Sequence, residues 1–187
     1  GELLGESISA NLELSVTDRS ASIVAKDTII SMGTDTWRVD KISGNWKHEQ
    51  AEKRSYRHWN ISASGAELDV SSSSRFIEGV LEGFQPEIAS HLGLARPLGK
   101  VLNWTFGYRS DGTTPMVSVQ ADLQKIQFRS TGKMLGLGPI SGRVSIIDSK
   151  GEVALSADSM PIDWLAMTHR ELNLDSVKAV LSVDVSD

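Results

Sequence analysis

The sequence predicts a mostly β protein, built mainly as an antiparallel sheet with a short two-helix insert. Three observations predict it: apolar and polar residues alternate through many separate segments, turn residues divide these segments, and one central stretch has helical spacing instead. Successive side chains of a strand point to opposite faces, so each alternating segment has one apolar side and one polar side.

The first strand group is expected within residues 1–71. Asp18-Arg19-Ser20 is a turn, Gly33 a hinge, the polar stretch 51–55 a hairpin tip, and Ser64-Gly65 a further turn. Between them, the predicted strands are Ser7–Thr17, Ala21–Ala25, Thr28–Met32, Thr36–Ile42, Gly44–Gln50, Tyr56–Ala63 and Glu67–Ser71.

A helical insert is expected within residues 72–96. Ser74 is a suitable N-cap, and the apolar stripe from Phe76 to Phe84 has helical spacing. Pro86 suits the first turn of a second helix, which ends at Gly93. We expect the Phe76–Phe84 stripe to dock as a plug or lid over an open end of the sheet.

The second strand group is expected within residues 97–187. Its predicted strands are Val101–Arg109, Met116–Phe128, Ile140–Asp148, Glu152–Asp158 and Val177–Ser186. A turn at Ser149-Lys150-Gly151 makes Gly142–Ala157 the clearest hairpin. The segment Pro161–His169 fits either a helical turn or an irregular crossover.

Composition excludes several function classes. The net charge is −5 and there is no basic run, so nucleic acid is not an expected partner. Without cysteine the chain has no disulfide, thiolate metal site or cysteine nucleophile. No apolar run reaches the ~18 residues of a membrane span. The chain starts without Met or a signal peptide and stops in a strand, so we expect an internal fragment of a longer protein.

Catalytic and metal motifs are also weak. The four histidines, His48, His58, His91 and His169, have no ligand spacing, and Glu78 with Glu82 fits a solvated helix face. The stretch 136–142 matches neither a serine-hydrolase elbow nor a dinucleotide-binding loop. Asp158 with Asp163 is the only faint carboxylate pair. We therefore expect no enzyme activity, cofactor or metal.

Four passages occur in an order that resembles the YhdP branch of the AsmA-like family. They are Ile42-Ser43-Gly44-Asn45-Trp46 followed by Trp59-Asn60-Ile61, then 96–102, then 138–144 with 151–155, and finally 171–183. The resemblance runs from about Val39 to the C-terminus. One departure is Ser182, where relatives often carry an aromatic residue.

The resemblance implies a specific function. Such proteins are anchored in the Gram-negative inner membrane and extend a curved, open, β-taco-like groove through the periplasm, which conducts phospholipid toward the outer membrane. This chain would be one segment of that groove, contacting acyl chains, with both membranes reached through other parts of the protein. The expected groove residues are Leu12, Leu14, Val16, Ile61, Trp104, Phe106, Val117, Val119, Ala121, Val144, Ile146, Val153, Leu155, Leu181 and Val183.

Two other functions stay open. The same strands could close into a sandwich or barrel that serves as a structural scaffold, because alternating apolar residues most often form an ordinary core. A carbohydrate-binding or hydrolytic β protein would need exposed aromatic residues around paired carboxylates. Unpaired edge strands also favour self-association of the fragment.

Overall fold

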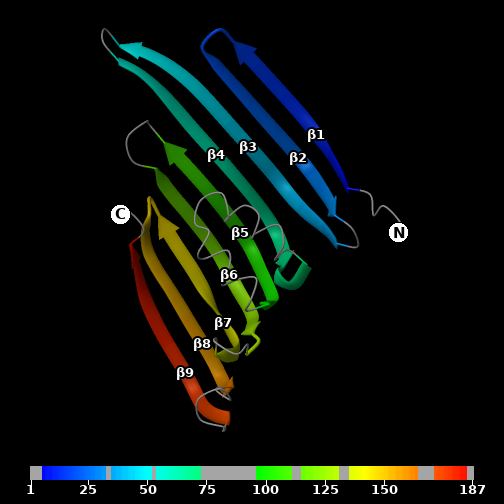
Figure 1. The fold of residues 1–187 in the computed structure, drawn as a ribbon, viewed down its shortest axis with the longest axis vertical. Coiled ribbons are helices and arrows are strands. Elements are labelled where there is room, and N and C mark those ends of the chain that lie inside the picture. The colour runs from blue at the N-terminus through cyan, green and yellow to red at the C-terminus, as the bar shows by residue number, and fades with distance from the viewer. Residues whose placement is uncertain are drawn as a thin grey trace.

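The described part of the chain folds into one open antiparallel sheet. The structure, a computed structural model, describes residues 6–32, 35–51, 54–72, 96–110, 115–130, 135–163 and 171–184. Within them nine strands lie side by side in chain order, β1 to β9 (Figure 1). Each strand pairs only with its sequence neighbours, so β1 and β9 form opposite edges and the sheet does not close on itself. The mostly β, antiparallel prediction is confirmed.

The strands are longer than the sequence pattern indicates. Their bounds are β1 Glu6–Thr17, β2 Ser20–Met32, β3 Asp35–Ala51, β4 Arg54–Asp69, β5 Leu98–Ser110, β6 Met116–Phe128, β7 Gly136–Ile147, β8 Lys150–Asp163 and β9 Glu171–Asp184.

Three predicted breaks are wrong. The pairs of segments expected on either side of Asp27, Ser43 and Gly65 are each one continuous strand, β2, β3 and β4 respectively. Of the segment Pro161–His169, expected as a helical turn or crossover, the first three residues belong to β8 and the rest lies outside the described residues. The two predicted strand groups join into one sheet because β4 pairs with β5. The expected helices, the Gly33 hinge, His91 and His169 lie outside the described residues.

Cross-strand register gathers the apolar side chains on one face, here called the apolar face. Residues directly opposite each other on neighbouring strands share a face. Leu14 lies opposite Ile23, Ile23 opposite Gly44, and Gly44 opposite Ile61. The row continues through Tyr108 and Val117. A longer row crosses the whole sheet through Leu12, Ala25, Ile42, Ala63, Phe106, Val119, Ile146, Gly151 and Val183.

The opposite face, here called the serine face, is mostly polar, although exposed apolar residues such as Ile147 and Val180 also lie on it. Ser15 lies opposite Ser22, and Ser43 opposite Ser62, where the two hydroxyl oxygens are 2.7 Å apart. Exposed ion pairs also lie there, such as Lys26–Glu13 at 2.8 Å and Arg143–Asp122 at 2.8 Å. Exposed pairs of this kind contribute little to stability, so the serine face is a solvated surface.

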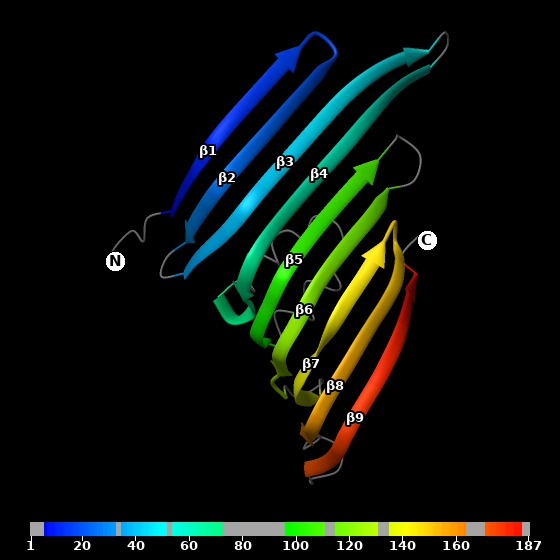
Figure 2. The ribbon, with the colours of Figure 1, turned by 180° about the vertical axis from the view of Figure 1, so that it is seen from behind.

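A band of bulges and irregular pairs shifts the alternation by one residue. The pairing register shifts between Ser9 and Asn11 in β1 and between Leu102 and Thr105 in β5. Left-handed backbone marks the same band at Asp27 (φ 50°), Asn103 (φ 48°) and Ser176 (φ 55°). Short polar side chains tolerate that conformation best, and a bulge bends and twists its strand. The bowed strands are visible in Figure 2.

In the sequence, the alternation of apolar and polar residues shifts by one residue at the same band. In β8, Asp158 and Ser159 are both exposed, and the next residue, Met160, is buried. In β3, Asp40 and Lys41 are both exposed, and Val39 is buried. An extra residue moves every later side chain to the other face, so the sequence slip keeps apolar residues on the apolar face at both ends.

Two-residue turns close the best-defined hairpins. In the β7–β8 turn, Asp148 (φ 49°) and Ser149 (φ 70°) both have left-handed backbone, as a type I′ turn requires. The buried Ser149 donates its N–H to the Val117 carbonyl at 2.7 Å and accepts the Val117 N–H at 3.1 Å through its hydroxyl. The predicted hairpin is confirmed, with its turn earlier than expected, since Lys150 and Gly151 belong to β8.

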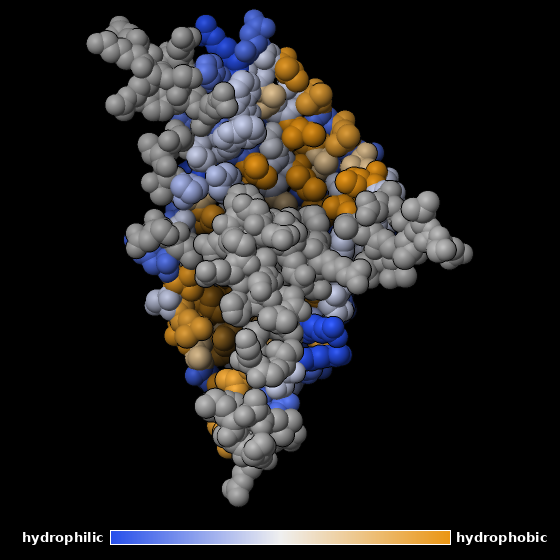
Figure 3. Space-filling model, in the orientation of Figure 1, coloured by the Kyte–Doolittle hydropathy of each residue, from blue (hydrophilic) through white to orange (hydrophobic). Residues whose placement is uncertain are grey.

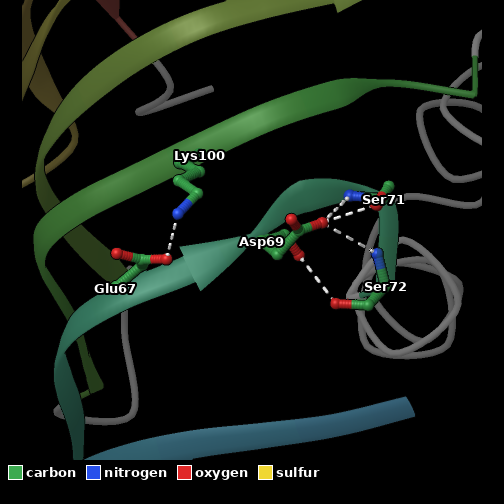
Figure 4. Close-up of polar contacts among 5 residues, drawn as sticks. All are labelled: Glu67, Asp69, Ser71, Ser72 and Lys100. Carbon is green, nitrogen blue, oxygen red and sulfur yellow. Dashed lines mark hydrogen bonds and ion pairs between the residues drawn. The ribbon is translucent and has the colours of Figure 1, made fainter. Parts of the chain in front are cut away.

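Asp69 caps the helical turn Val70–Ser72 that follows β4 (Figure 4). Its carboxylate accepts the backbone N–H of Ser71 at 2.9 Å and that of Ser72 at 3.2 Å. The hydrogen bond from the Ser71 hydroxyl holds the pKa of Asp69 below its ordinary value. The cap satisfies N–H groups that the first helical turn leaves unpaired.

Replacement of Gly142 by Ala is expected to destabilise the fold. A Cβ at Gly142 would overlap the Ala154 carbonyl oxygen, which is backbone and cannot rotate away. The expected loss is about 1–3 kcal/mol in urea unfolding. Gly107 is the matched control, because a Cβ there meets Ser118 Cβ at an ordinary 3.6 Å. Equal losses for Gly142→Ala and Gly107→Ala would contradict the close backbone approach.

Replacement of Asp69 by Ala is expected to cost about 1 kcal/mol, whereas Asn retains most of the cap. Because the folded pKa of Asp69 is lowered, its charge stabilises the fold above its ordinary pKa of 3.8, and this contribution disappears as the pH falls through the folded pKa. Unfolding curves of wild type and Asp69→Asn should therefore converge on acidification. A gap that widens as the pH falls would refute the assignment.

Candidate functional site

The apolar face is the candidate site. Figure 3 shows hydrophobic side chains gathered over β1 and β2 and again over β7 and β8. Leu14 is 71% exposed and Val16 is 66% exposed on the edge strand, and Ile61 on an inner strand is still 39% exposed. Soluble proteins rarely leave large contiguous apolar surface open to water unless it binds something.

Every predicted groove residue lies on this face. Pairing places Leu12, Leu14 and Val16 beside β2, and the chain of partners continues through Ile61 and Phe106. The other members join through pairs at the centre and the far edge: Val117, Val119, Ala121, Val144, Ile146, Val153, Leu155, Leu181 and Val183. Leu12, Phe106 and Leu181 are exposed, Ala121 is buried, and most of the inner-strand members are half-buried.

On this face, the indole ring of Trp104 packs against the backbone of β4. It lies opposite Gly65 across β4 and β5, and a Cβ at Gly65 would come within 2.8 Å of its indole ring. The missing side chain therefore lets the indole lie flat against β4. The buried indole Nε1 has no hydrogen-bond partner among the described residues, so this Trp contributes chiefly apolar surface.

At the level of the β1–β2 turn, the apolar face ends in aromatic residues of β3 and β4, here called the aromatic end. The rings of Trp46 and Trp59 lie 6.4 Å apart at 52°, and those of Trp46 and His48 are stacked 6.2 Å apart. Trp59 is 45% exposed. The N–H of His48 donates to the Arg19 carbonyl at 2.8 Å, which ties this end to the β1–β2 turn.

The serine face carries open hollows with mixed polar and apolar linings. One of about 550 Å³ is lined by the Arg143–Asp122 pair, Ser156 and Lys178, and lies across β6 to β9. The hydrogen bond from Arg143 holds the pKa of Asp122 below its ordinary value. Of the two cations that line the hollow, Arg143 is thus already paired with a carboxylate, and the other is Lys178.

Sequence reasoning missed part of the apolar face. Ile23, Ile42, Trp46 and Tyr108 lie on it beside the predicted residues. The signal was present, because Ala21, Ile23 and Ala25 alternate with polar neighbours in the same way. The bulge at Asp27 interrupts this alternation and resembles a turn in the sequence, so the apolar side of β2 was not recognised.

The weaker catalytic and metal-ligand candidates from the sequence do not come together into a site. Asp158 and Asp163 lie along extended β8, about 17 Å apart at about 3.3 Å per residue. His48 and His58 belong to opposite faces, since His58 pairs with Lys47. The residues that the structure describes contain no group of three potential metal ligands. In the same residues, no helix is long and apolar enough to span a membrane.

Comparisons with protein-family models, with curated proteins and with solved structures find no match to this chain.

Replacement of Gly65 by Val is expected to move Trp104 off β4 into solvent. Its side chain would occupy the space of the indole ring, which is 2.8 Å from a Cβ at this position. In a variant that keeps Trp104 as its only tryptophan, the emission should shift to longer wavelength. Ala66→Val is the control, because Ala66 is exposed. An unchanged spectrum in Gly65→Val would show that Trp104 packs elsewhere.

Proposed function

We propose that this chain binds lipid acyl chains on its apolar face and conducts phospholipid as one segment of a periplasmic, inner-membrane-anchored protein. The observation that carries the proposal is the continuity of the apolar face through all nine strands. In this proposal the curved sheet forms the groove, and lipid moves across the strands toward the outer membrane. The role is binding and conduction, without a chemical reaction or cofactor.

The energetics of the apolar face suit hydrocarbon. Burial of one methylene is worth about 0.8 kcal/mol, so a tail of about fifteen methylenes gains on the order of 10 kcal/mol before association costs. Leu12, Phe106 and Leu181 offer exposed apolar surface on three separate strands. A tail has no polar groups to match, so no convergent polar pocket is needed on this face.

Repetition along the sheet favours movement over tight binding. Neighbouring strands present similar apolar side chains, such as Val144 opposite Val153 and Val153 opposite Leu181. A tail that passes from one strand to the next exchanges one apolar contact for an equivalent one. Near-equal sites of this kind give low barriers between positions.

The periplasmic location and the inner-membrane anchor rest on the ordered resemblance to the YhdP branch of the AsmA-like family. The open sheet suits that architecture, because long edge strands such as β1 and β9 leave backbone groups ready to pair with further strands. In an isolated fragment the same edges would favour self-association.

A non-transporting scaffold is the second candidate. It is favoured by the buried end of the apolar face, where Trp37 is 4% exposed and Val39 is 7% exposed, as in an ordinary core. The exposed apolar side chains of β1, β2 and β4 favour the lipid proposal over the scaffold.

Replacement of Leu14 by Gln is expected to weaken binding of a pyrene-labelled phosphatidylglycerol about tenfold, because Leu14 is largely exposed and would be buried only by bound lipid. Ser15→Gln is the matched control, since Ser15 is the next residue and belongs to the serine face. Equal binding by wild type and Leu14→Gln, or no binding by wild type, would refute the proposal.

A further inference from the structure

In β3 and β4, exposure of the apolar face falls from the aromatic end to the far end. Within β4 and the turn after it, Trp59 is 45% exposed, Ile61 is 39% exposed and Val70 is 8% exposed. Within β3, Trp46 is half-buried and Trp37 is 4% exposed. Two neighbouring strands thus show the same gradient, open at the aromatic end and closed beyond the bulge band.

The chemistry changes along the same direction. At the aromatic end, Trp46 and Trp59 combine a large apolar ring with a polar N–H, the combination that is enriched where hydrocarbon meets water. Below them lie purely aliphatic residues such as Ile42 and Ile61, in the rows that also hold Gly44 and Ala63. The apolar face is therefore amphipathic along the strands.

An arginine and an imidazole border the aromatic end. His48 stacks on Trp46, and its backbone N–H is bonded to the turn residue Arg19, which is exposed. Asp18, the other residue of that turn, is also exposed and offsets part of this charge. The charge of Arg19 complements a phosphate at the boundary between apolar and aqueous surroundings, and the imidazole of His48 offers a hydrogen-bonding group beside it.

The distance along β3 between the two ends is longer than the depth of one bilayer leaflet. The strand from Trp46 to Val39 rises about 23 Å at about 3.3 Å per residue. One leaflet of a bilayer has about half of a ~30 Å hydrocarbon core. A tail of about 15 Å that begins at the aromatic end would extend to about Ile42, on the way to the buried residues beyond the bulge band.

We propose that the aromatic end holds the phosphate and glycerol region of a bound phospholipid, with Arg19 and His48 beside the phosphate and the tails running along β3 and β4 toward Val39 and Val70. This inference rests on the proposed function and fixes the orientation of the lipid. The rings of Trp46 and Trp59 lie at the boundary between the headgroup and the tails, and they hold the lipid in one orientation as it passes.

Tryptophan fluorescence quenching tests the orientation in the full chain. One variant keeps only Trp46 and Trp59, and a second keeps only Trp104, with the other tryptophans replaced by Phe. Each is titrated with phosphatidylglycerol that carries a nitroxide either on its headgroup or near the end of one tail. The headgroup probe should quench Trp46 and Trp59 more strongly, and the tail probe should quench Trp104 more strongly.

The charge at the aromatic end is tested separately. Arg19→Gln should weaken binding of phosphatidylglycerol about fivefold. Lys26→Gln is the control, because Lys26 lies on the serine face. An equal effect of both substitutions would overturn the role of Arg19.

The outcomes separate this inference from the proposed function. Quenching by both probes in the reverse or an equal pattern would overturn the orientation and leave lipid binding in place. Absence of quenching by either probe, together with no lipid retained in native mass spectrometry, would overturn both. Retention of a protein partner on the aromatic end in place of lipid would also overturn the orientation.

Discussion

Cross-strand register is the constraint on which the rest of this structure depends. Most apolar side chains of each strand point to one side, and a slip of one residue in any pairing would turn that side toward the serine face. The observed register places Ile23, Ile61 and Phe106 on the same face although they come from separate hairpins. The apolar face exists because every ladder holds this alignment.

The bulge band extends this constraint over long strands. β3 is 17 residues long, and because every strand twists, a regular sheet of such long strands would accumulate a strong twist. The irregular pairs at Asp27, Asp40 and Asn103 bend the strands, and the sequence changes phase at the same places. The same few polar residues therefore determine both the curvature of the sheet and the continuity of its apolar face.

Local patterns in the sequence predicted the strands and the sidedness of their residues, because alternation is a property of a single strand. Leu12, Leu14 and Val16 lie as predicted for that reason. The bulge at Asp27 broke the local pattern and was interpreted as a strand break. Pairing between distant residues, such as Gly65 with Trp104, has no local signal, so the packing of that indole required the structure. The aromatic end was missed because Trp46 and Trp59 come from different strands and meet only through register.

The most direct test of an apolar face open to hydrocarbon is photocrosslinking with a phosphatidylglycerol that carries a diazirine near the middle of one acyl chain, followed by peptide mapping. The account predicts crosslinks at apolar-face residues such as Ile23, Ile61 and Phe106, with none at their serine-face neighbours Ser22, Ser62 and Thr105. Crosslinks spread evenly over both faces, or absent from the apolar face, would contradict it.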